Sequence, residues 1–214
     1  MILYLNGAFV GLLILANIVA VKLFSIGSFV ILPAAVIIYI FTYPIIDVIV
    51  EVYGKKHAQR TVRAGLITQV FALVFISAAI ALPSAPVFSG QQSFETILGG
   101  SFRVIIASLI SYFVSVNLDV LVFNNLKRRH GQKKLWLRNN ASTMLSQLVD
   151  TAIFIGIAFY GIVPTPVLGI MIVTQYTFKF FAAIATTPLV YLMVHLIRKR
   201  EVEGAAENGA LVIK

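Results

Sequence analysis

The sequence predicts an all-α membrane protein, a polytopic bundle of six transmembrane helices. Three observations support this fold class: 59% of the residues are hydrophobic, only 12% are charged, and six long apolar runs are separated by short polar segments. Soluble domains are about half apolar and about a quarter charged, so this composition is typical of a chain that lies mostly in lipid. A single transmembrane domain is therefore expected over residues 1–200.

Each apolar run is long enough to cross a bilayer, which takes about 20 helical residues. The predicted spans are 2–21, 28–52, 62–82, 102–124, 141–160 and 166–197. The last span is long enough to tilt or to project from the membrane. Residues 201–214 are small and polar, and we expect a disordered cytoplasmic tail or a vector-derived remnant there.

The positive charges indicate how the spans are oriented. Thirteen of the 17 Lys and Arg residues lie in the segments 53–63, 125–140 and 198–200, whereas the other connections carry only Lys22 and Arg103. The positive-inside rule then places both termini in the cytoplasm. Because the basic residues follow the span ends, the net charge of +9 does not indicate a nucleic-acid partner; the expected surroundings are the lipid bilayer.

The second span contains the most informative stretch, residues 42–56, which read TYPIIDVIVEVYGKK. Asp47 and Glu51 are four residues apart, so they share one face of a helix. Pro44 cannot donate a backbone hydrogen bond and loosens the helix one turn earlier. Carboxylates in lipid are costly and usually functional, which favours a polar cavity on this face. The alternative is that both acids lie at the water boundary and neutralise the basic residues that follow.

Other spans also contain polar side chains, and we expect them to line one cavity with Asp47 and Glu51 for a translocated solute. These further candidates are Asn17, Asn117, Asp119, Gln147, Asp150, Gln175 and Lys179.

Two relationships among these candidates follow from spacing and depth. Asn117 and Asp119 are two residues apart, so on a regular helix they point to nearly opposite sides. Lys179 lies well inside its span and needs a partner, and Asp150 lies at a similar depth. We therefore predict an Asp150–Lys179 ion pair, whose role is either structural or part of the cavity.

Several classes of chemistry have no support in the sequence. There is no Cys, so disulfides and thiol chemistry are excluded. A glycine-rich phosphate loop, the HExxH metal motif and a nucleophile elbow are all missing. We expect neither an enzyme nor a bound metal or cofactor. No Lys or Arg precedes Lys22, so the first apolar run is expected to be a retained helix and not a signal peptide.

Residues 43–47 and 51–56 resemble the signature of the queuosine precursor transporter family, also called the vitamin uptake transporter family. The short stretches 117–119 and 146–151 resemble later motifs of that family, and the resemblance covers about residues 17–199. It implies a multi-pass carrier of the bacterial inner membrane that imports 7-cyano-7-deazaguanine, with 7-aminomethyl-7-deazaguanine as a second candidate substrate. Both compounds are precursors for the queuosine modification of tRNA.

Two other functions stay open at this point. One is the substrate-binding membrane subunit of an ATP-driven vitamin importer, although we expect no ATPase partner. The other is an intramembrane enzyme acting on lipid-linked substrates, with Asp47 and Glu51 near the cytoplasmic face. Whether the protein forms a homo-oligomer, and which ion drives transport, cannot be read from the residues.

Overall fold

The structure, a computed structural model, describes residues 1–27, 30–130 and 135–207. Within these residues six helices are long and apolar enough to cross a membrane, which confirms the predicted fold class. They are α1 (Ile2–Val19), α2 (Ala35–Tyr53), α3 (Lys55–Ala81), α4 (Gln91–His130), α5 (Leu135–Phe159) and α6 (Thr165–Glu207). Large apolar side chains such as Phe71, Phe75 and Phe113 are exposed on the bundle surface, as lipid-facing residues are.

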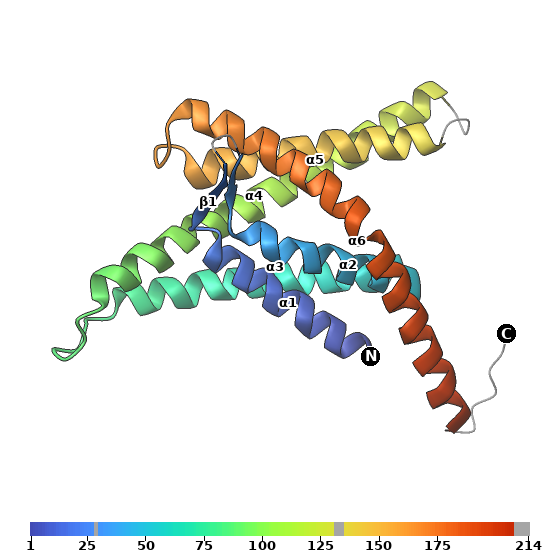
Figure 1. The fold of residues 1–214 in the computed structure, drawn as a ribbon, viewed down its shortest axis with the longest axis horizontal. Coiled ribbons are helices and arrows are strands. Elements are labelled where there is room, and N and C mark those ends of the chain that lie inside the picture. The colour runs from blue at the N-terminus through green and yellow to red at the C-terminus, as the bar shows by residue number, and fades with distance from the viewer. Residues whose placement is uncertain (28–29, 131–134, 208–214) are drawn as a thin grey trace.

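The helix connections lie at two ends of the bundle (Figure 1). One end, which we call the basic end, holds the turn between α2 and α3, the last turn of α4, the first turn of α5 and the last turns of α6. The opposite end holds the connections 20–34, 82–90 and 160–164. α2 and α3 meet at Gly54, whose φ of 84° suits glycine and allows a tight turn between two spans.

The predicted start of the second span at residue 28 is wrong. Two antiparallel strands precede α2: β1 (Leu23–Ile26) and β2 (Val30–Pro33). Their Val, Ile and Phe side chains favour extended backbone, and Pro33 disfavours helix at the residue before it. The strands satisfy each other's backbone groups, and the Thr174 hydroxyl of α6 donates to the Ile31 carbonyl at 3.0 Å. The hairpin therefore lies against α6 at the opposite end.

Four helices, α3 to α6, are longer than the apolar pattern predicts, and α4 and α6 extend furthest beyond it. α4 begins at Gln91, and not at residue 102. α6 continues to Glu207, into the segment for which the sequence favours an irregular tail. Residues 208–214 of that segment lie outside the described residues. In both cases the helix continues past the apolar segment, because hydropathy marks the lipid crossing and not the helix end.

The buried apolar residues form two clusters. The cluster near the opposite end joins α1, α2, α4, α5 and α6, and its members are Ala16, Ala20, Ala35, Val104, Ala107, Phe154, Ile155, Ala158, Phe159, Leu168 and Met171. Five of these are alanines, which let helices approach closely in lipid. The cluster near the basic end joins only α1, α2, α3 and α6, through Leu5, Phe9, Ile45, Val48, Ile49, Ala58, Val194 and Ile197. Among the described residues, α4 and α5 contribute no buried member to this second cluster.

Candidate functional site

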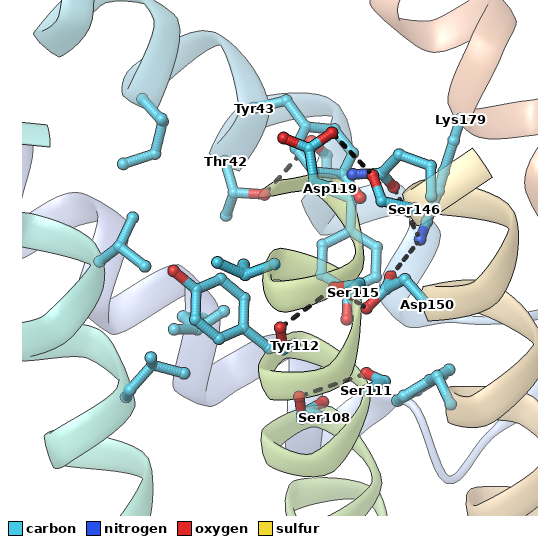
Figure 2. Close-up of a pocket in the computed structure, with 18 of the residues that line it drawn as sticks. Thr42, Tyr43, Ser108, Ser111, Tyr112, Ser115, Asp119, Ser146, Asp150 and Lys179 are labelled. Atoms are coloured by element: carbon cyan, nitrogen blue, oxygen red, sulfur yellow. Dashed lines mark hydrogen bonds and ion pairs between the residues drawn. The ribbon is translucent and has the colours of Figure 1, made fainter. Parts of the chain in front are cut away.

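A cavity of about 590 Å³ lies between the helices and reaches Lys55 in the first turn of α3. This volume suits a small organic ligand. All six helices contribute to its wall, part of which Figure 2 shows. The polar residues that line it are Tyr39, Thr42, Tyr43, Asp47, Lys55, Gln59, Gln69, Ser108, Ser111, Tyr112, Ser115, Asp119, Thr143, Ser146, Gln147, Asp150, Gln175 and Lys179.

The predicted Asp150–Lys179 ion pair is confirmed and lies on the cavity wall (Figure 2). The Lys179 Nζ lies 2.9 Å from Asp150 Oδ2. It also donates to Thr151 Oγ1 at 3.1 Å and to Gln147 Oε1 at 3.5 Å. An ammonium group has three N–H donors, so these three acceptors on α5 occupy all of them. Lys179 therefore anchors α6 to α5.

One face of α4 forms a polar stripe that sequence analysis missed. Ser108, Ser111, Tyr112, Ser115 and Asp119 follow each other at steps of three, one, three and four residues, so they line up along the helix and face the cavity. The Ser111 hydroxyl donates to the Ser108 carbonyl at 3.2 Å, and the Ser115 hydroxyl donates to the Tyr112 carbonyl at 3.1 Å. Their oxygens keep lone pairs for a ligand. The helical spacing of these Ser residues in the sequence could have predicted this polar face of α4.

Asn117 and Asp119 point to different sides of α4, as their spacing predicts. The Asp119 carboxylate lines the cavity and accepts a hydrogen bond from the Ser146 hydroxyl at 3.4 Å. The Asn117 amide is exposed, does not line the cavity, and donates to the Phe113 carbonyl of its own helix at 2.7 Å. Asn117 is therefore separated from the other candidates.

Asp47 and Glu51 have different surroundings although they are on one face of α2. Asp47 lines the cavity, and in the described part of the chain no hydrogen bond or ion pair ends on its carboxylate. Glu51, one turn nearer the basic end, lies outside the cavity and accepts from Arg198 Nη2 at 2.9 Å. The structure therefore brings Asp47 to the other candidates and leaves Glu51 at an exposed ion pair.

Three buried amide side chains also lie at the cavity wall or directly behind it. Asn17 is 1% exposed and accepts from the Ser108 hydroxyl at 2.9 Å, which places it directly behind the cavity wall. Gln175, a sequence candidate, and Gln69, which sequence analysis missed, both line the cavity. Gln69 is an amide within the apolar segment of α3. An amide in lipid needs a polar environment, so the sequence could have identified Gln69 as a candidate site residue.

Tyrosine rings provide flat surface in the same cavity. Tyr39 and Tyr43 lie one turn apart on α2 with their ring centroids 5.7 Å apart and their planes at 27°. Tyr112 of α4 also lines the cavity (Figure 2). Stacked aromatic rings present both a face for planar ligands and hydroxyl groups for hydrogen bonds.

Among the charged groups of the cavity, carboxylates outnumber ammonium groups. The cavity has three carboxylates, on Asp47, Asp119 and Asp150, and two ammonium groups, on Lys55 and Lys179. Lys179 is fully occupied by acceptors of α5, so the Asp47 and Asp119 carboxylates remain for a ligand. Within residues 1–27, 30–130 and 135–207 no three His, Asp or Glu side chains come together as a metal site would need. Such a wall favours a small, flat solute rich in N–H groups.

Comparison with known proteins identifies related transporters. A protein of Bacillus subtilis named "Probable queuosine precursor transporter" is 35% identical over 158 residues, which cover 72% of this chain and 68% of the relative. A Haemophilus influenzae protein of the same name is 32% identical over 56% of this chain and 50% of its own length. The "Queuosine precursor transporter" of Escherichia coli is 30% identical over 56% of this chain and 53% of its own length. No solved structure matches the chain significantly.

The family model described as "Putative vitamin uptake transporter" matches residues 33–193, which include α2 to α5 and most of α6. The match therefore includes every cavity residue except those of α1. The family and the named relatives are described as transporters and not as enzymes. The alternative function as an intramembrane enzyme is therefore not supported. The chain is a multi-pass membrane transporter that belongs to the vitamin uptake transporter family.

Proposed function

We propose that the protein imports a queuosine precursor, 7-cyano-7-deazaguanine, with 7-aminomethyl-7-deazaguanine as a second substrate. The names of three related transporters support the substrate class, and the composition of the cavity supports the ligand chemistry. The observation that carries the proposal is the carboxylate of Asp47, which has no partner among the described residues and lies in a cavity of about 590 Å³ lined by tyrosines.

The polar groups of a 7-deazaguanine match the cavity wall one by one. Its N1–H and its exocyclic amine lie side by side, and a carboxylate such as Asp47 accepts both. Its O6 needs a donor, and Gln147 retains its amide N–H groups because its Oε1 accepts from Lys179. Its planar ring suits the stacked Tyr39 and Tyr43.

The decisive experiment is uptake into sealed proteoliposomes that contain only this chain. Radiolabelled 7-cyano-7-deazaguanine should accumulate above the level in protein-free liposomes, and unlabelled 7-aminomethyl-7-deazaguanine should compete. Uptake should need no ATP, because we propose that the chain works without an ATPase partner. Uptake that appears only after an ATPase and ATP are added would overturn the proposal that the chain works without an ATPase partner. No specific uptake under any ion gradient would overturn the substrate assignment.

We also propose that the basic end faces the cytoplasm of a bacterial inner membrane, with both termini inside. The charge distribution supports this orientation, and it makes the cavity, which reaches Lys55, accessible from the cytoplasm. The native chain has no Cys, so single cysteines can report the topology. An impermeant thiol reagent should label Ser89→Cys in intact cells and should not label Lys56→Cys. The reverse pattern would overturn the orientation.

A further inference from the structure

The Asp119 carboxylate of α4 lines the cavity with a single long hydrogen bond. The Ser146 hydroxyl of α5 lies 3.4 Å from Asp119 Oδ1, but the same hydroxyl lies 3.0 Å from the Thr143 carbonyl oxygen of its own helix. A hydroxyl has one proton to donate, so the nearer carbonyl competes with the carboxylate for it. In the described part of the chain no cation pairs with Asp119. The carboxylate therefore keeps most of its capacity to accept hydrogen bonds from a ligand.

The two ammonium groups of the cavity do not compensate this charge. Lys179 donates to three acceptors on α5 at distances of 2.9 to 3.5 Å, and Asp150 is the closest of them. Lys55 is exposed to water in the first turn of α3 and forms no ion pair with a described carboxylate. Asp119 is partly buried, and a charge shielded from water is unfavourable unless it has a partner. A cationic group on the ligand would be such a partner.

The proposed orientation of the substrate directs one of its substituents toward Asp119. In a 7-deazaguanine, O6 and the substituent on C7 project from the same edge of the ring system. Gln147, the proposed donor to O6, directly follows Ser146, whose hydroxyl contacts Asp119 across the gap between α5 and α4 (Figure 2). Gln147 and Asp119 both line the cavity. A base whose O6 accepts from Gln147 therefore has its C7 substituent on the side where α5 meets Asp119.

We propose that Asp119 distinguishes the two candidate substrates, because it binds the ammonium group of 7-aminomethyl-7-deazaguanine. The inference rests on the proposed function. A primary alkylamine is protonated at neutral pH, as a lysine side chain is, and its N–H groups form charge-assisted hydrogen bonds with a carboxylate. The cyano group is neutral and its nitrogen only accepts hydrogen bonds, so a carboxylate repels it. The cavity should therefore bind the aminomethyl compound more tightly than the cyano compound.

Titration calorimetry of the purified protein with both compounds tests this assignment. Asp119→Asn keeps the size of the side chain and removes its charge. The variant should bind the aminomethyl compound ~10²-fold more weakly than the parent does, the effect of losing one charge-assisted hydrogen bond. It should bind the cyano compound more tightly, because an amide N–H group can donate to the nitrile nitrogen. If the ratio of the two affinities is the same in Asp119→Asn as in the parent, the proposal is wrong.

Asp47→Asn is the matched control. The N1–H group and the exocyclic amine that we assign to Asp47 are present in both compounds, so this variant should weaken the binding of both by the same factor. The ratio of the two affinities should then equal that of the parent. A ratio that falls equally in Asp47→Asn and Asp119→Asn would mean that both act through the total charge of the cavity, and would contradict a specific contact with Asp119.

A second test varies the ligand and uses the unmodified protein, so it does not depend on the folding of a variant. 7-hydroxymethyl-7-deazaguanine replaces the ammonium group with a neutral hydroxyl of similar size. The parent should bind it about tenfold more weakly than the aminomethyl compound, since a charge-assisted hydrogen bond becomes a neutral one. Equal binding of these two compounds by the parent would refute the role of Asp119 alone. If the parent binds no 7-deazaguanine at all, the proposed function fails and this assignment fails with it.

Discussion

Two ion pairs in this protein have the same nitrogen–oxygen distance, 2.9 Å, and very different surroundings. Lys179 and Asp150 are 13% and 21% exposed on the cavity wall, whereas Arg198 and Glu51 are 57% and 60% exposed at the basic end. The first pair also includes Thr151 and Gln147 as acceptors.

The comparison teaches that distance alone does not decide what an ion pair contributes. Removing one partner of the pair on the cavity wall leaves a charge that is largely shielded from water, which costs more than the same loss at an exposed site. An exposed pair exchanges its partner for water, and its contribution is roughly 0–1 kcal/mol. Asp47 is a third case, a carboxylate in the cavity whose partner we propose to be the ligand. The following predictions test these differences, from the largest expected effect to the smallest.

The largest effect is expected for Lys179→Met. The substitution leaves the Asp150 carboxylate without its cation on the cavity wall, which should cost up to about 3 kcal/mol of folding stability because the carboxylate is only 21% exposed. Thermal unfolding of the purified protein in detergent would show this as a strongly lowered melting temperature, and proteoliposome uptake should be lost.

A double-mutant cycle attributes that loss to the pair. Asp150→Asn combined with Lys179→Met removes both charges, so the double variant should be more stable than the sum of the two single losses implies. The cycle compares the melting temperatures of the parent, the two single variants and the double variant. Strictly additive shifts would mean that the Lys179–Asp150 contact at 2.9 Å contributes no coupling energy.

The next effect concerns binding and not stability. Asp47→Asn should weaken binding of 7-cyano-7-deazaguanine by ~10²-fold, taking a charge-assisted hydrogen bond as ~1.5–3 kcal/mol. An amide keeps one acceptor but presents an N–H group to a ligand N–H. The melting temperature should hardly change, because Asp47 has no partner to lose in the described structure. Titration calorimetry measures the affinity. Parent-like affinity combined with lost transport would assign Asp47 to a conformational or proton-coupling step.

The smallest effect is expected for Glu51→Gln. The exposed pair with Arg198 should contribute less than ~1 kcal/mol, so the melting temperature should fall only slightly. Salt screens exposed charges, and at about 1 M salt the variant and the parent should melt together. Arg198→Gln is the matched control and should give the same small, salt-sensitive shift. A large shift that persists in high salt would show that the pair is desolvated in the membrane.

The sequence predicted the local features of the fold well. Apolar runs of sufficient length predicted six helices, and helical spacing predicted that Asn117 and Asp119 separate. The Asp150–Lys179 pair was predictable because an ammonium group deep in a span needs an acid at the same depth. The Ser stripe of α4 was equally readable from its spacing and was missed, because single hydroxyls in a transmembrane helix often bond only to their own backbone.

Other features depend on which helices become neighbours. Strand β2 occupies the start of an apolar stretch that the sequence predicts as helix, and it is supported by its pairing with β1 and by α6. Glu51 and Asp47 share a face of α2, yet Arg198 comes close to Glu51 only because the far end of α6 packs beside α2. No pattern in α3 alone shows that Gln69 faces a cavity, since that depends on the position of α4.

The sequence by itself therefore determined that the described part of this chain has six helices able to cross a membrane, and which polar side chains lie within them. Hydrocarbon thickness and the cost of unpaired polar groups act on each segment separately, so local composition is sufficient for both conclusions. The tertiary structure alone decided that Asp47, Asp119, Gln69 and Gln175 meet in one cavity while Asn117 and Glu51 do not. The physical reason is that a cavity forms where neighbouring helices do not pack closely. Small residues such as Ala16, Ala107 and Ala158 decide where the helices do pack closely, and therefore where the cavity remains.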